Sequence, residues 1–168
     1  QADIAQRLKD TQALWENREI EELINLPPMT DAEQLAAMQI LLTISAVAYL
    51  SSPSIYILIV CQQIQLSVKY GNTIASTYAY VAYGLLLCSL VEDVDLACRF
   101  GQLSLQLLKQ LNAQELRCTV YAMFNCFIQH RKAHLRTTLK NIQEGYFIGL
   151  ETGDVEFASY AALYKTIH

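Results

Sequence analysis

Turn-forming residues recur along this chain at a spacing of about 40 residues. They stand at Asp31, Asn72, Asn112 and the pair Gly153-Asp154, and each precedes a segment rich in small residues: AEQLAAMQ, IASTYAY, ELRCTVYAM and EFASYAAL. Small side chains allow the two helices of a hairpin to approach closely. A repeat period of roughly 20–50 residues is typical of arrays in which each unit buries its apolar face against the next. The spacing therefore predicts an all-α fold, an α-solenoid of antiparallel helical hairpins.

Shorter breaks divide each repeat into two helices. The pair Pro27-Pro28 ends the helical segments at the N-terminus, because proline cannot continue a helix. Pro53 occupies a favourable first helical position, and the sequence HRKAH marks a further turn. No segment alternates for long with period two, so strands are not expected. The predicted helices span residues 2–17, 19–26, 31–50, 53–70, 73–90, 94–111, 113–129, 134–151 and 155–168.

A single domain is expected, because 168 residues with 53% hydrophobic side chains suffice for one sizeable core. Residues 1–28 would be a helical lead-in, and residues 30–168 the hairpin repeats. Thr30 or Asp31 can cap the first repeat helix, and with Thr30 as the cap Glu33 stands at the capping-box position. The chain begins with Gln rather than Met, so we expect it to be a segment of a longer protein.

The first helices of three repeats carry a pattern similar to that of the tetratricopeptide repeat, in which bulky residues flank a small one. The period here exceeds the ~34 residues of that repeat. We therefore expect longer helices and a tetratricopeptide-like array. The pattern occurs at Tyr80, Tyr83, Gly84 and Leu87, at Tyr121, Phe124, Asn125 and Ile128, and at Leu41, Ile44, Ser45 and Ala48.

Charge and cysteine content narrow the functional classes. A net charge of −4 disfavours nucleic-acid binding, which requires a basic surface for phosphates. Five cysteines occur without a CxxC motif, and an odd number does not suit a disulfide framework. We expect buried free thiols, and hence a reducing, cytoplasmic compartment.

Two long stretches, 34–68 and 70–91, contain no charged residue and raise the question of membrane insertion. A spanning helix needs roughly 20 mostly apolar residues in succession. Ser residues, Pro53 and several glutamines interrupt the first stretch, and Asn, Ser and Thr interrupt the second. Helices buried on several sides within a stack account for the same composition, so no membrane contact is predicted.

No motif for catalysis, cofactor binding or metal binding is present. The sequence lacks a P-loop, GxGxxG, GxSxG, HExxH, an EF-hand loop and a kinase catalytic loop. His130 and His134 have a spacing that could share a helix face, but Arg131 and Lys132 between them would repel a divalent cation. We therefore expect no enzymatic activity, no cofactor and no metal.

A basic cluster surrounds the HRKAH turn, and an acidic segment stands before the helix predicted at 94–111. The basic cluster is either a solvated turn or a docking patch for an acidic or phosphorylated segment. The acidic residues could bind a cation, but their place before a helix N-terminus already accounts for them. The cluster comprises Arg131, Lys132, His134, Arg136 and Lys140, and the acidic segment Glu92, Asp93 and Asp95.

The tetratricopeptide-like alignment also predicts which residues face the concave side of the array. This predicted groove is uncharged and partly apolar, which suits a hydrophobic peptide helix or other domains of the same polypeptide. Most tyrosines on the first helices should serve packing instead. The predicted groove residues are Tyr78, Val81, Leu85, Cys88, Thr119, Ala122, Cys126 and Gln129.

Several stretches go beyond a generic helical repeat. They are residues 23–88, beginning LINLPPMTDAEQLAAMQ, residues 100–139, beginning FGQLSLQLLKQLNAQEL, and residues 144–162, EGYFIGLETGDVEFASYAA. These stretches resemble the helical region of large cyanobacterial signalling proteins that combine a serine/threonine kinase, an AAA-type ATPase, a GAF sensor and a histidine kinase. The resemblance implies an intracellular scaffold between the ATPase and the sensor-kinase modules. Catalytic residues of that family lie in its other domains, so none transfers to this chain.

The expected function is therefore a non-catalytic protein-interaction and domain-coupling module of a signal-transduction kinase. Its partners would be proteins or peptides, including other domains of the parent chain, and a homodimer is also possible because apolar surface can remain exposed. The alternative is a regulatory domain that senses a small apolar ligand or peptide in its concave groove.

Overall fold

The computed structural model describes residues 2–132 and 135–167, with the backbone alone at 2, 135–138, 156 and 164–167. Every element over this range is helical, which confirms the predicted all-α fold. One isolated bridge joins Pro28 to Asn72. The α-helices are α1 (Ala2–Ala13), α2 (Ala32–Ser51), α3 (Pro53–Tyr70), α4 (Ile74–Leu86), α5 (Val94–Gln110), α6 (Arg117–Ala122), α7 (Leu135–Thr152) and α8 (Val155–Ile167). Shorter turns are η1 (Ile20–Asn25), η2 (Leu87–Val91), η3 (Gln114–Leu116), η4 (Met123–Ile128) and η5 (Gln129–Arg131).

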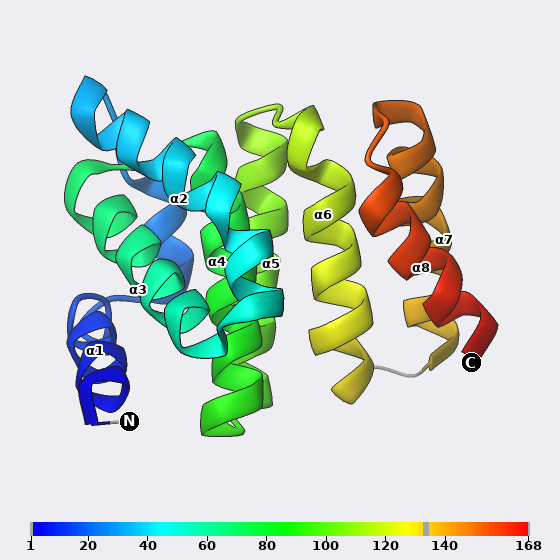
Figure 1. The fold of residues 1–168 in the computed structure, drawn as a ribbon, viewed down its shortest axis with the longest axis horizontal. Coiled ribbons are helices and arrows are strands. Elements are labelled where there is room, and N and C mark those ends of the chain that lie inside the picture. The colour runs from blue at the N-terminus through cyan, green and yellow to red at the C-terminus, as the bar shows by residue number, and fades with distance from the viewer. Residues whose placement is uncertain (1, 133–134, 168) are drawn as a thin grey trace.

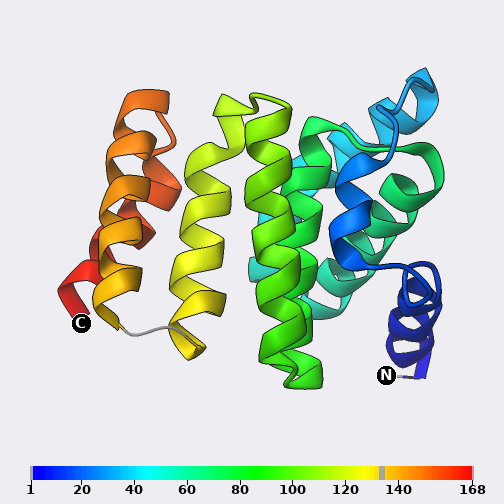
Figure 2. The same cartoon turned by 180° about the vertical axis from the view of Figure 1, so that it is seen from behind.

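The helices are arranged along the long axis of the molecule broadly in chain order, except that α1 packs against α3 and α2 also contacts α4. Figure 1 shows α1 at one end of the molecule, α7 and α8 at the other, and α4 to α6 between them. Neighbours in sequence pack against each other, as in the pairs α2–α3, α4–α5, α6–α7 and α7–α8. Helices α2 and α8 lie on the side nearest the viewer in Figure 1. Helices α5 and α7 lie on the opposite side, which Figure 2 shows.

Capping residues set the helix boundaries where the sequence predicted breaks. Of the two candidate caps for α2, Asp31 is the one used, because its carboxylate accepts the backbone N–H of Glu33 (2.9 Å) and Gln34 (3.1 Å). Helix α3 begins at Pro53 and ends before Gly71, as predicted. Asp93 caps α5 by accepting the N–H of Leu96 at 2.9 Å, which agrees with the predicted role of the acidic segment.

Two predicted helices are not regular to their ends. The segment predicted at 73–90 is α-helical to Leu86 and continues as the π-helical turn η2, and the segment predicted at 113–129 becomes the π-helical η4 after Ala122. The N-terminal helix ends at Ala13 rather than at residue 17. It ends there because the chain turns so that Trp15, which is 6% exposed, packs into the core.

An aromatic cluster joins the N-terminal segment to the middle of the stack. Trp15 lies edge-on to Phe100 of α5 and to Tyr83 of α4, with ring centroids 5.2 and 6.2 Å apart. Tyr83 and Phe100 are themselves edge-on at 5.1 Å. Such pairs contribute about 0.5–1.5 kcal/mol each beyond the burial of their area. Residues before α2 therefore belong to the same core as α4 and α5.

A buried polar network fixes the path of residues 23–29, and Asn72 is its centre. The Asn72 side chain donates to the carbonyl of Leu23 (2.8 Å) and accepts the hydroxyl of Tyr80 (2.8 Å). Its backbone N–H donates to the carbonyl of Pro27 (2.8 Å), and its carbonyl accepts the N–H of Met29 (2.9 Å). The bonds to Leu23, Pro27 and Met29 hold the chain before α2 against the turn between α3 and α4, and the bond from Tyr80 of α4 fixes the Asn72 side chain.

Gly71 is required at this junction. Its φ of +107° lies in a region that L-residues rarely adopt, and a Cβ atom there would stand 2.1 Å from the carbonyl oxygen of Pro27. Close approach of the two backbones at this point makes the Asn72 network possible.

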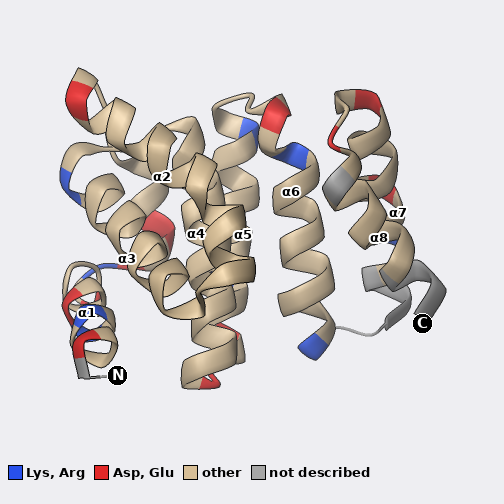
Figure 3. Ribbon diagram, in the orientation of Figure 1, with Lys and Arg blue, Asp and Glu red and all other residues tan. Residues whose placement is uncertain are grey.

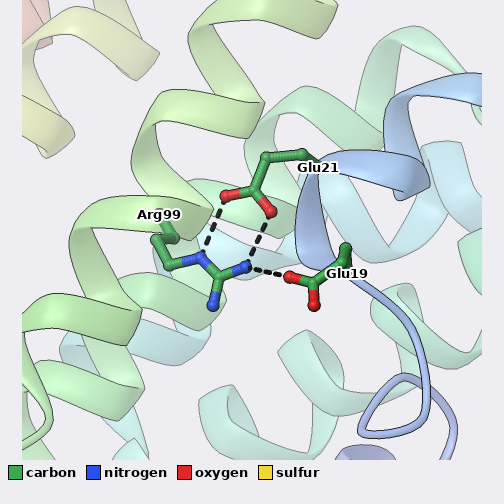
Figure 4. Close-up of polar contacts among 3 residues, drawn as sticks. All are labelled: Glu19, Glu21 and Arg99. Carbon is green, nitrogen blue, oxygen red and sulfur yellow. Dashed lines mark hydrogen bonds and ion pairs between the residues drawn. The ribbon is translucent and has the colours of Figure 1, made fainter.

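A surface ion pair supports the same N-terminal segment. Arg99 of α5 binds Glu21 through two hydrogen bonds of 2.9 and 2.7 Å and Glu19 through a third of 2.9 Å (Figure 4). The guanidinium hydrogen bonds lower the pKa of Glu21 to about 2. These side chains are largely exposed, so the cluster contributes at most about 1 kcal/mol.

All five cysteines are free and buried, as predicted. Burial raises the pKa of Cys118 and of Cys126 to about 12, so both are neutral thiols at physiological pH. Their role is that of small apolar side chains.

Two helices of the described part of the chain are long and apolar enough to cross a membrane, judged by length and composition alone: 32–51, which is α2, and 74–91, which is α4 with η2. Of the second segment, 72% of the residues are buried within the fold, as is ordinary for a core helix, whereas only 17% of the residues in the corresponding stretch of α2 are buried. Helix α2 therefore presents an apolar surface that the rest of the described chain leaves uncovered.

Candidate binding groove

A cavity of about 440 Å³ opens among α2, α4, α6 with η4, and α8, and Tyr56 of α3 and Leu116 of η3 also line it. We call it the groove. Helices α2 and α8 supply its two walls, and α4 and α6 with η4 lie between them. The described lining consists of Leu42, Ala46, Tyr49, Leu50, Tyr56, Tyr78, Leu85, Leu116, Thr119, Met123, Phe127, Phe157, Tyr160 and Leu163.

Helical periodicity explains why each helix contributes several side chains to the groove. On α8, Phe157, Tyr160 and Leu163 follow one another at intervals of three, and on α4 Tyr78 and Leu85 stand seven apart. Residues spaced by three, four or seven lie on one helix face. The lining is thus one continuous face of each helix.

The π-helical turn η4 belongs to the groove surface, because Met123 and Phe127 both come from it. A π turn places an additional residue in the helical turn and changes the direction of the side chains that follow. Methionine adapts its shape to different apolar partners, which suits a binding surface.

The polar atoms of the lining are hydroxyl groups. Burial, together with the neighbouring Tyr78 phenol, raises the pKa of Tyr56 above its ordinary value, so it remains a neutral phenol. Tyr49 packs edge-on against Tyr56 with centroids 5.2 Å apart. The hydroxyl of Thr119 donates to the carboxylate of Asp154 at 2.9 Å, and Asp154 also caps α8 through the N–H of Phe157.

This arrangement can bind apolar and aromatic groups and can offer them neutral hydrogen bonds. Every described lining residue is aliphatic, aromatic, hydroxyl-bearing or, at Met123, a thioether, and none is charged. A charged group placed inside would lose hydration against side chains that carry no counter-charge, which costs several kcal/mol. The groove therefore selects uncharged surfaces.

The structure separates the residues predicted to face the groove into two sets. Tyr78, Leu85 and Thr119 line it. The others lie elsewhere: Val81, Cys88 and Cys126 are 0% exposed within core clusters, Ala122 is 1% exposed, and Gln129 is half-buried beyond the end of η4. In this conformation those five residues pack within the fold and do not line the groove.

The basic cluster around the HRKAH turn lies apart from the groove lining. Arg131 and Lys132 are exposed, and the Lys132 ammonium pairs with the carboxylate of Asp95, which joins the basic cluster to the acidic segment. This pairing raises the pKa of Lys132. The side chain of Arg136 and the whole of His134 lie outside the described residues. The predicted pair of His130 and His134 therefore lies partly outside them as well. Over the described residues no group of three or more His, Cys, Asp or Glu could hold a metal ion.

Sequence reasoning missed the walls of the groove. Residues such as Tyr49, Leu50 and Leu163 are more than one-third exposed although they are large and apolar. Their spacing along α2 and α8 was visible in the sequence. Which face of α2 and α8 turns towards α4 and α6 depends on how each pair of helices is rotated relative to the next pair. The spacing of apolar residues within one helix does not predict that rotation.

Comparison of the chain with protein-family models, with curated proteins and with solved structures gives no match in any of the three. The resemblance to the helical region of cyanobacterial signalling proteins therefore rests on the residues alone.

Proposed function

We propose that this chain is a non-catalytic, tetratricopeptide-like interaction module that binds an apolar protein surface in the groove. The observation that carries this proposal is the composition of the groove, to which the first helices of the hairpins α2–α3, α4–α5 and α6–α7, together with α8, contribute uncharged side chains. Stacked helical hairpins generally bind partners on the surface formed by equivalent helices. The partner surface would be an amphipathic helix or the apolar face of a neighbouring domain.

The distribution of charge supports a protein partner over a nucleic acid. Along the helices that form the groove, charged residues are sparse and lie mainly at helix ends (Figure 3). A nucleic acid would require a row of Lys and Arg side chains for its phosphates. The net charge of −4 argues in the same direction.

The resemblance to cyanobacterial signalling proteins supplies the context of the proposal. In that context the module is cytoplasmic, and it couples ATPase and sensor-kinase domains of one polypeptide. Burial of an apolar domain surface in the groove would transmit the position of one domain to the next. Catalysis would reside in the other domains, because the sequence carries none of the motifs that such chemistry needs.

A pair of charge-insertion variants on one helix tests the groove. Leu163→Glu places a carboxylate in the groove at a residue that is 53% exposed, so the fold should tolerate it. Val155→Glu, on the same helix and 65% exposed, lies outside the lining and serves as the control. Binding of the other domains of the parent polypeptide, supplied as a separate chain, is measured by isothermal titration calorimetry. We expect the wild type and Val155→Glu to bind alike and Leu163→Glu to bind at least ~10-fold more weakly. Equal binding by both variants, or none by the wild type, would refute the proposal.

The size of the groove supports a second candidate function, the sensing of a small apolar ligand. A volume of about 440 Å³ lies within the range of roughly 300–1,000 Å³ that is usual for small-molecule sites. The neutral fluorophore N-phenyl-1-naphthylamine distinguishes the two functions. Saturable 1:1 binding that raises the Tm and is lost in Leu163→Glu favours a ligand sensor; weak, non-saturable binding favours a protein partner.

A further inference from the structure

Helix α2 exposes an apolar stripe on the side that faces away from its neighbours. Its buried residues are Met38, Ser45 and Ala48, and the stripe lies on the opposite side of the helix. We call it the α2 stripe: Ala36, Ile40, Thr43, Val47 and Leu50, all exposed. Leu50, at the C-terminal end of the stripe, also borders the groove.

The spacing within the α2 stripe is that of a helix-packing seam. The five residues follow at intervals of four, three, four and three, which is the heptad spacing through which one helix packs against another. Ile40, Val47 and Leu50 are 61%, 67% and 72% exposed, so the seam has no partner within the described chain.

The hydroxyl groups on and beside the α2 stripe already have hydrogen-bond partners within α2. The hydroxyl of Thr43 donates to the carbonyl of Gln39 (2.8 Å), and that of Ser51 donates to the carbonyl of Val47 (2.7 Å). No charged residue occurs between Glu33 and Lys69, and Figure 3 shows α2 without charge beyond its first turn. Nearly all of the surface that a partner on the stripe would remove from water is therefore apolar.

The exposed apolar area on and beside the stripe is that of a weak interface. Four large apolar residues of α2 are between 42% and 72% exposed there: Ile40, Ile44, Val47 and Leu50. With about 150–200 Å² for each full side chain, they expose on the order of 400 Å². A standard protein interface buries about 800 Å² on each partner, and smaller ones are typical of weak, reversible association.

We propose that a second copy of this chain covers the α2 stripe, with the two α2 helices crossing antiparallel about a two-fold axis near Thr43. The order of side-chain sizes favours self-pairing in this direction. Antiparallel packing sets the small Ala36 opposite the large Leu50 of the second copy, and Ile40 opposite Val47, around the short Thr43. Parallel packing would set Leu50 against Leu50 and Ala36 against Ala36, which crowds one end and leaves a gap at the other.

Self-pairing also fits the absence of charge on α2. Charged residues beside a seam select unlike partners or orientations and exclude others. The α2 stripe carries none, so nothing in it opposes a second copy. Two identical faces related by a two-fold axis form a closed dimer, the commonest form of oligomer.

The first test measures the molar mass of the full chain by sedimentation velocity across a concentration series. We expect a monomer–dimer equilibrium that Val47→Lys weakens by at least ~100-fold, because the two-fold axis places the charge in the interface twice. Leu90→Lys changes an apolar residue of η2 that is 51% exposed, and it should leave the equilibrium unchanged. Val47 does not line the groove, so this result is independent of the groove variants. A wild type that is monomeric throughout, or a dimer that Val47→Lys leaves intact, overturns the proposal.

The second test locates the axis with a short bismaleimide cross-linker. Thr43→Cys places two thiols next to the axis and should yield covalent dimers. Ser51→Cys lies on the same face, but antiparallel packing puts its two copies ~24 Å apart, at ~1.5 Å per residue, so it should not cross-link. All five native cysteines are buried and provide a low background. Cross-linking of Ser51→Cys, with or without that of Thr43→Cys, contradicts the antiparallel arrangement, because parallel packing would bring both pairs of residues together.

A lipid surface is the rival occupant of an uncharged helix face. Co-sedimentation with phosphatidylcholine vesicles decides between the two. Binding of a monomeric chain to the vesicles that disappears in Val47→Lys would overturn the dimer proposal, and no binding alongside a dimer would support it.

Discussion

The Asn72 network makes a quantitative prediction about stability. Asn72→Ala removes the acceptor of Tyr80 and the donor to Leu23, two bonds of 2.8 Å between groups that are at most 4% exposed. Each bond contributes about 1 kcal/mol net, and each buried polar group left unpaired adds about 1–3 kcal/mol. Allowing for overlap between these effects, we expect a loss of ~2–4 kcal/mol. Tyr80→Phe breaks one of the two bonds and should cost ~1–2 kcal/mol.

Equilibrium unfolding in urea measures both costs. Far-UV circular dichroism follows the helices, and fluorescence of the single tryptophan, Trp15, follows the N-terminal segment. The double variant Asn72→Ala/Tyr80→Phe should lose ~1 kcal/mol less than the sum of the single variants, since they share one hydrogen bond. Tyr121→Phe, at a half-buried tyrosine, should stay within ~0.5 kcal/mol of the wild type. Strict additivity, or a loss below ~1 kcal/mol for Asn72→Ala, would refute the reasoning.

Three further predictions concern packing, charge and thiol chemistry. Gly101→Ala should destabilise the fold by ~1–2 kcal/mol, because its Cβ would stand 2.1 Å from the buried ring of Phe124 and overpacking outweighs the gain in helix propensity. Gly145→Ala, whose Cβ would have its nearest contact at 3.5 Å, should stabilise it by ~0.5–1 kcal/mol, and urea unfolding measures both changes. Arg99→Ala should lower stability by less than ~1 kcal/mol at pH 7. This loss should vanish as pH falls from 4.5 towards 2, where Glu21 loses the charge that Arg99 stabilises. A loss of stability that persists at pH 2 would contradict this. The five cysteines should react with Ellman's reagent only at the rate of opening in the native protein and fully in denaturant, and a rapid native reaction would show that at least one is accessible.

Much of the fold could be predicted because turns and caps are local. Pro53 and Gly71 bound α3 at the predicted residues, and the glycine of the repeat pattern, Gly84, lies where α4 meets α5. A Cβ atom on Gly84 would stand 2.9 Å from the carbonyl oxygen of Ala97. These features follow from the conformational limits of Pro and Gly and from the need of paired helices for small residues.

The remainder depends on contacts between residues far apart in sequence. Periodicity in one segment cannot predict that Trp15 ends α1 by packing on Tyr83 and Phe100, or that Asn72 reaches Leu23. The π-helical turns η2 and η4 are also not predictable from helix propensity, which does not favour them.

The predicted groove residues show the same division. Tyr78, Leu85 and Thr119 were assigned from the repeat pattern and do line the groove. Cys88 and Cys126 came from the same pattern and are buried, because each helix of a stack is covered on several sides and the pattern does not distinguish them.

Methyl NMR of the methionines tests the central claim, that the groove is the binding site, most directly. The chain has three methionines, and only Met123 lines the groove, whereas Met29 packs in a separate cluster near the N-terminus. On titration of ¹³C-methyl-labelled protein with the partner domains of the parent polypeptide, the account predicts a shift or broadening of the Met123 resonance and an unchanged Met29 resonance. Saturable binding that leaves Met123 unchanged would contradict it.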